Sequence, residues 1–247
     1  MRVPAASPAA PPPKPRADVA RAPWDALPLP ICPRLLAPET REHMAALALF
    51  ARALREAVEA SEEKDARIGR VETLELALSG AFGPALSRPE LLPAVILRDS
   101  LLATGGSFAD MLALADAAKD EIAGVIPSDG RAPLDHAART VAPVLRHLLH
   151  LHGNRDDSLL ARADELARAW FFLRRDGADS ARLAEAMLRR AGDLAASVSD
   201  GHLKAQLYRL QALARAALAT KSTDVAALSA FTRLRVRLVA WLKLWTG

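Results

Sequence analysis

The chain has 247 residues, of which 51% are hydrophobic and 25% charged, and its mean hydropathy is +0.07. This composition describes a water-soluble globular protein with one large core or two small ones. No apolar run reaches the roughly 18 residues of a membrane span. The net charge of +4 is uneven, because residues 201–247 carry +7 and residues 39–200 carry −6. The protein therefore lacks the all-over basic surface of nucleic-acid-binding proteins, and we expect no nucleic-acid partner.

Residues 1–38 are predicted to form an extended arm. They contain eleven of the seventeen prolines, including the run Pro11-Pro12-Pro13, which favours a stiff segment without helix. The first part of the arm has the Ala, Ser and Pro content of an organellar targeting segment. Because it has no amphipathic Arg-rich helix, we interpret it as an arm instead.

Residues 39–247 are predicted to form one all-α bundle, since we find neither strand-like alternation nor a repeat. Met44, Leu47, Phe50 and Leu54 recur every three or four residues and indicate one face of a helix. Pro143 lies inside a helical pattern and should kink it. Helices are expected over 39–60, 64–79, 90–104, 107–123, 132–152, 157–175, 179–198, 201–220 and 224–245.

Two groups of residues suggest metal or nucleophile chemistry but do not have the required spacing. His147 and His150 are neighbours on a helix, whereas His152 points elsewhere, and no carboxylate stands at a Glu-x-x-His spacing. Cys32, the single cysteine, has no basic neighbour closer than Arg34 and can form no internal disulfide. We therefore expect no metal site and no cysteine nucleophile.

The C-terminal helix has an apolar stripe with basic flanks. Tryptophan with Arg or Lys on an amphipathic helix is typical of a helix at a membrane interface or a partner surface. The same pattern describes a helix that docks on its own bundle, which is the interpretation we prefer for the stripe. The stripe consists of Leu228, Phe231, Leu234, Leu238, Trp241 and Trp245, and the candidate contact residues are Arg233, Arg235, Arg237, Trp241, Lys243 and Trp245.

Three segments in register resemble the squalene/phytoene synthase family. The first is Leu29-Pro-Ile-Cys-Pro-Arg-Leu-Leu-Ala-Pro38 with the Phe-Ala-Arg helix that follows it. The second is Ala142-Pro-Val-Leu-Arg-His-Leu-Leu-His-Leu-His-Gly153, and the third is the closing helix from Thr232 to Trp245. The resemblance covers nearly the whole chain and implies an all-α isoprenoid-synthase bundle, in agreement with the helical periodicity.

The resemblance also implies a metal site that this sequence does not keep. Family members join two prenyl diphosphates, and Mg²⁺ held by two aspartate-rich motifs on facing helices takes the diphosphate charge. The aspartates of the first motif fall at Arg55 and Glu59, and Glu56 replaces an adjoining acid. Arg55 therefore places a cation where a metal ligand belongs.

The second motif is changed as well. Its helix carries Trp170, Phe171 and Phe172, which should line or fill the pocket. Only Asp176 and Asp179 follow them, one residue closer together than the motif requires. The family's basic-Tyr segment has no Arg or Tyr here, and the glycine of the Ala-Pro-Val-Gly helix is replaced by a leucine.

We therefore interpret the chain as a degenerate, non-catalytic member of the family that needs no cofactor. It would act as a scaffold, accessory subunit or assembly factor of a membrane-associated complex, for example a respiratory one. A mitochondrial complex I assembly factor carries the same domain, which is an analogy for this role. The expected contacts are with a protein partner through the arm or the basic C-terminal helix, or peripherally with a membrane.

Two alternatives stay open. The chain could be a prenyl-diphosphate synthase whose makeshift Mg²⁺ site uses Glu56, Glu59, Asp176 and Asp179, or a non-catalytic protein that binds an isoprenoid. The expected location is the cytoplasm or the periphery of the inner membrane in a bacterium, and the mitochondrial matrix in a eukaryote.

Overall fold

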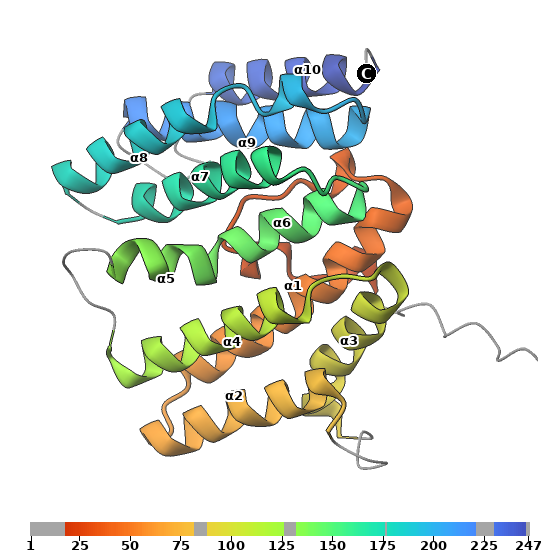
Figure 1. The fold of residues 1–247 in the computed structure, drawn as a ribbon, viewed down its shortest axis with the longest axis vertical. Coiled ribbons are helices and arrows are strands. Elements are labelled where there is room, and N and C mark those ends of the chain that lie inside the picture. The colour runs from red at the N-terminus through yellow and green to blue at the C-terminus, as the bar shows by residue number, and fades with distance from the viewer. Residues whose placement is uncertain (1–17, 82–87, 126–131, 176, 221–229, 246–247) are drawn as a thin grey trace, which may run out of the picture.

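The protein is all-α, as the periodicity predicts. The computed structural model describes residues 18–81, 88–125, 132–175, 177–220 and 230–245, and these contain α-helices and short 3₁₀ helices but no strand. Figure 1 shows the helices in successive layers, from α10 and α9 at one end, through α7 and α8 and then α5 and α6, to α1–α4 at the other. The helices are α1 (Pro38–Glu59), α2 (Lys64–Ser79), α3 (Leu92–Thr104), α4 (Phe108–Ala123), α5 (Ala132–Thr140), α6 (Ala142–Leu151), α7 (Asp157–Leu173), α8 (Ala178–Ala191), α9 (Gly201–Thr220) and α10 (Ala230–Trp245).

Side-chain caps and proline explain most of the helix ends. The Ser107 hydroxyl accepts the amide hydrogen of Asp110 and begins α4, and the Asp156 carboxylate accepts that of Leu159 and begins α7. The expected helix over 132–152 divides at Val141 into α5 and α6, because Pro143 has no amide hydrogen to continue the ladder. The predicted kink is therefore a break between two helices.

Two expected boundaries differ from the structure. The helix expected over 179–198 ends at Ala191, because Gly192 adopts φ 60° and ψ −147°, a conformation that favours glycine. A short 3₁₀ helix, η6 (Ala195–Ser197), follows. The last helix is described from Ala230, and the expected start at residue 224 lies outside the described residues.

The described part of the arm, residues 18–37, lies against the helices. Its 3₁₀ helices contact α1 and α9, and its leucines Leu29 and Leu36 belong to the main hydrophobic core. The amide of Cys32 donates to Gln206 Oε1 over 3.2 Å, which holds the arm on α9. The 3₁₀ helices are η1 (Val19–Arg21), η2 (Trp24–Ala26) and η3 (Pro33–Leu35). This half of the arm is thus a packed layer, whereas residues 1–17 lie outside the described residues.

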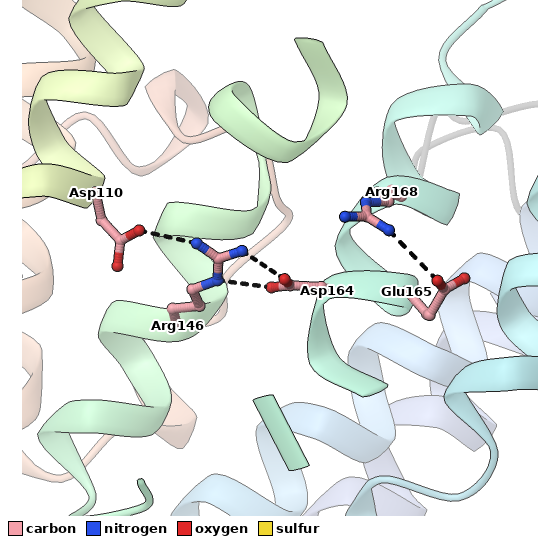
Figure 2. A network of polar contacts seen from close by, with 5 residues as sticks. All are labelled: Asp110, Arg146, Asp164, Glu165 and Arg168. Carbon is pink, nitrogen blue, oxygen red and sulfur yellow. Dashed lines mark hydrogen bonds and ion pairs between the residues drawn. The ribbon is translucent and has the colours of Figure 1, made fainter. Parts of the chain in front are cut away.

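One arginine joins three helices in the middle of the bundle (Figure 2). Arg146 on α6 donates from Nε to Asp164 Oδ1 on α7 over 2.8 Å, and from Nη1 to Asp110 Oδ1 on α4 over 2.9 Å. Its second guanidinium nitrogen also donates to Asp164. These contacts raise the pKa of Arg146, chiefly through the hydrogen bond to Asp164. The network joins α4, α6 and α7, and α4 and α7 also contribute walls to the cavity described next.

Candidate functional site

A cavity of about 340 Å³ lies where α1, α4, α7 and the α5–α6 junction meet. Its walls are mostly apolar, with Leu54 and Val58 on α1, Leu114 on α4 and Phe171 on α7. The arm covers part of it through Ala26 and Pro28. These helices include the segments expected to carry the two motifs.

Arg55, which the sequence resemblance predicts at the position of a first-motif aspartate, lines this cavity and is hydrogen-bonded to the arm. Its Nη2 donates to the carbonyl oxygens of Asp25 over 3.1 Å and of Ala26 over 2.9 Å. Both acceptors are backbone groups without formal charge. The guanidinium thus adds a positive charge to the cavity wall.

The opposite wall adds two more arginines, which the sequence analysis did not single out. Arg174 and Arg175 both line the cavity, at the end of α7 and just after it. Burial lowers the pKa of Arg174, and the nearby positive charge of Arg55 lowers it further. The Arg175 guanidinium lies over the Phe171 ring, 5.3 Å from its centroid. The signal that could have found them is the pair of cations directly before Asp176.

The expected carboxylates do not gather at the cavity. Glu59 lines it, but Glu56 is exposed and pairs with Arg52 over 2.7 Å. Asp179 is also exposed and pairs with Arg182 over 3.2 Å, and Asp176 lies outside the described residues.

The cavity has a second carboxylate, that of Glu121 on α4, which was not among the residues predicted from the sequence. Its Oε1 lies 3.3 Å from His136 Nε2. Among the described lining residues, two carboxylates therefore stand with three guanidinium groups.

A family-model comparison identifies the chain's relatives. The model of squalene/phytoene synthase matches residues 29–174, which run from the arm through the end of α7. The chain belongs to the squalene/phytoene synthase family. A comparison with curated proteins gives no match. The all-α bundle is that of the isoprenoid-synthase type, as the resemblance implied.

The Mg²⁺ site implied by the squalene/phytoene synthase family does not fit the residues at the cavity. Mg²⁺ takes oxygen ligands, several of them carboxylates or phosphates, in near-octahedral geometry. Among the described residues, no group of three or more His, Cys, Asp or Glu side chains could hold a metal ion. The guanidinium groups of Arg55, Arg174 and Arg175 also oppose a divalent cation electrostatically.

The three aromatic residues expected to line one pocket point in different directions. Phe171 lines the cavity, while Trp170 borders a hollow under the arm and Phe172 borders one beside α8 and α9. Successive residues of a helix are about 100° apart, so three in a row cannot share one wall. Phe171 and Phe172 still touch edge to face, with centroids 5.3 Å apart.

The candidate contact residues of the C-terminal helix lie at the far end of the bundle from α2 and α3 (Figure 1). Arg235, Arg237 and Trp241 are exposed on α10. The side chains of Arg233, Lys243 and Trp245 lie outside the described residues. None of the described helices is long and apolar enough to cross a bilayer.

Proposed function

We propose that this chain is a non-catalytic squalene/phytoene synthase family protein that acts as an accessory subunit or assembly factor of a membrane-associated complex. The observation that carries the proposal is the position of the Arg55 guanidinium. It is bound to two arm carbonyls at the first-motif position and faces the cavity that Arg174 and Arg175 also line. A cation cannot replace an aspartate as a Mg²⁺ ligand, and without the metal the leaving diphosphate loses its main charge stabilisation.

The first test is direct. The purified full-length protein is incubated with farnesyl or geranylgeranyl diphosphate and Mg²⁺, next to an active family enzyme as the positive control. We expect neither pyrophosphate release nor a squalene-type or phytoene-type product. A product that depends on Mg²⁺ contradicts the proposal and supports the alternative of a surviving prenyl-diphosphate synthase.

The second test concerns the partner. The tagged full-length chain is purified from its native source under gentle conditions, together with a variant changed at the exposed arm residue Arg21. We expect a stoichiometric partner, in the cytoplasm, at the inner membrane or in the matrix, that the variant retains less well. A chain that purifies alone at native expression levels contradicts the accessory role.

A second candidate function is the binding of an isoprenoid anion without turnover. The observation that favours it is the combination of an apolar cavity of about 340 Å³ with three arginines at its wall. Guanidinium groups bind phosphate oxygens without a metal. If this function holds, farnesyl diphosphate raises the melting temperature equally with Mg²⁺ and with a chelator. An Arg174→Gln variant should lose that rise, while Arg182→Gln, on exposed α8, should keep it.

A further inference from the structure

The helix α10 docks on the bundle through small side chains. Val236 and Ala240 are buried, and Ala240 packs with Ala205 of α9 and Leu35 of the arm. Small residues allow two helices to approach closely while burying little area on each. The large apolar side chains of α10 therefore do not have to face α9.

Those large side chains point away from the bundle instead. Leu234 is 64% exposed, Leu238 54%, Trp241 52% and Leu242 46%. Their spacing of four, three and one residues places them on one side of the helix. This corrects our preferred interpretation of the stripe, since the described part of it does not dock on the bundle. Isolated exposed leucines are ordinary, but a continuous exposed stripe marks an interaction surface.

The surface around the stripe is positively charged. Neither α9 nor α10 contains a single Asp or Glu, and Arg235 and Arg237 are exposed beside the leucines. Within the described ranges, neither of these arginines forms an ion pair with a carboxylate. The cations of this face are therefore available to an external anion.

A groove of about 1200 Å³ between α10 and the arm continues the same surface. Leu234, Leu238 and Trp241 form one wall, and no Asp or Glu occurs among its described lining residues. Arg41 donates to the carbonyls of Pro33 and Leu36, so its charge is not neutralised there.

Arg209 on the same groove donates to the carbonyl of Pro30. Burial lowers the pKa of Arg209, and the positive charge of Arg237 lowers it further. Among the described residues that line the groove or form the stripe, the charged side chains are all arginines.

We infer that this face of α10 and the adjoining groove dock on an anionic phospholipid bilayer. Leucine and tryptophan side chains enter the boundary between headgroups and acyl chains, and the arginines bind lipid phosphates. A bilayer presents many anions at once over a plane, which matches two helices, α9 and α10, whose sequences carry basic but no acidic residues. A protein helix would need a matching row of acids in one register. The inference rests on the proposed function in one respect only, namely that the chain acts at a membrane-associated complex.

The test is co-sedimentation of the full-length protein with vesicles. One set contains phosphatidylcholine only, and the other is an equimolar mixture of phosphatidylcholine and phosphatidylglycerol. We expect binding to the anionic set that weakens as the ionic strength rises. Each interfacial cation contributes roughly fivefold, so Arg235→Gln combined with Arg237→Gln should weaken binding by about 30-fold. Leu238→Ser should also weaken it severalfold.

Matched controls come from elsewhere on the surface. Leu102→Ser changes an equally exposed leucine on α3, and Arg182→Gln changes an exposed arginine on α8. Both should bind like the unchanged protein, and all variants should keep its melting temperature. Three results overturn the inference: no binding to anionic vesicles, equal binding to both lipid sets, or binding that the α10 variants leave intact. A protein cross-linked to α10 in place of lipid overturns it too.

The product assay on the same preparation separates this inference from the proposed function. Failure to bind vesicles together with no prenyl product overturns only the membrane surface. Vesicle binding together with a Mg²⁺-dependent product overturns only the non-catalytic role. The two assays probe different residues, since no described residue of α10 lines the cavity that contains Arg55.

Discussion

The Nη2 of Arg55 donates a hydrogen bond of 2.9 Å to the carbonyl oxygen of Ala26 and thereby joins α1 to η2 of the arm. The two residues are 29 positions apart in the chain. The resemblance to the family predicts a metal-binding aspartate at this position, whereas the Arg55 side chain holds a segment of the arm backbone beside the cavity.

An aspartate placed at position 55 should not produce synthase activity. Arg55→Asp removes the donor to Asp25 and Ala26 and leaves Arg174 and Arg175 at the cavity. Because hydrogen bonds that involve a charged group contribute about 1.5–3 kcal/mol, we expect a loss near the lower end for this partly exposed contact. Urea unfolding measures the loss, and incubation with farnesyl diphosphate and Mg²⁺ should give no product.

The control for this variant is one turn earlier on the same helix. Arg52→Ala removes an exposed i,i+4 pair with Glu56, which should leave the free energy of unfolding nearly unchanged. If Arg55→Asp is as stable as Arg52→Ala, the hydrogen bonds of Arg55 to the arm do not stabilise the fold. If Arg55→Asp gains Mg²⁺-dependent activity, the non-catalytic role is wrong.

Helices could be predicted well because their signals are local. Apolar spacing, Ser107 and Asp156 as caps and Pro143 as a break act within a few residues, and the structure has helices at the expected places. The predicted C-terminal end of α8 was wrong, because the apolar pattern continues past Gly192 while the helical backbone ends at Ala191. A periodic pattern does not report where a glycine turns the chain.

The orientation of α10 could not be predicted from its sequence. Both its leucine stripe and its small-residue face could pack on the bundle. Which face packs depends on Ala205 of α9 and Leu35 of the arm, which contact Ala240. At the cavity, the resemblance located Arg55 and Glu59, which both line it. It missed Arg174 and Glu121, since their proximity to the cavity follows from how four helices converge.

The network around Arg146 should be a main determinant of stability. Arg146→Met leaves the largely buried carboxylates of Asp110 and Asp164 without their shared cation. Breaking a buried ion pair on one side costs about 3–5 kcal/mol, and we expect about 2–3 kcal/mol for this half-buried case. Chemical unfolding measures it, and Arg182→Ala, which breaks an exposed pair, should change little.

A double-mutant cycle distinguishes the network from simple packing. Asp164→Asn combined with Arg146→Met should cost clearly less than the two single changes added together, because the second change removes a charge that the first left unpaired. Additive costs would show that the ion pair contributes little.

The arm should behave as part of the folded domain. Leu29 is fully buried among core residues of the bundle. Leu29→Ala should therefore destabilise the whole protein by about 2–4 kcal/mol, as for other buried leucines. Thermal unfolding should remain a single transition at a lower temperature. Leu102→Ser, at an exposed position, is the control. A variant that melts like the unchanged protein would mean that the arm is not a layer of the core.

His147 should make the protein sensitive to mild acid. Burial lowers the pKa of His147 from 6.5 to about 3, and the positive charges of His150 and His43 oppose its protonation further. Neither of its ring nitrogens hydrogen-bonds a described residue. The neutral imidazole is therefore the folded form over the whole range between these two pKa values.

The direction of the pH dependence follows from this depressed pKa. Above pH 6.5 the histidine is neutral in both the folded and the unfolded chain, and its contribution to stability is fully present. As the pH falls from 6.5 toward 3, the unfolded chain takes up a proton that the folded chain does not. The free energy of unfolding then decreases by up to about 1.4 kcal/mol for each pH unit.

Replacing the ring should flatten that dependence. His147→Leu fills the site with an apolar side chain of similar size, so the free energy of unfolding should decline less between neutral and mildly acid pH, by about 1–2 kcal/mol. The lowered pKa values of His43 and His152 leave a remaining slope in both proteins. Urea unfolding at several pH values measures the difference, with Leu102→Ser as the variant that should keep the original slope. Parallel pH profiles for His147→Leu and the unchanged protein would mean that His147 is protonated in the folded state.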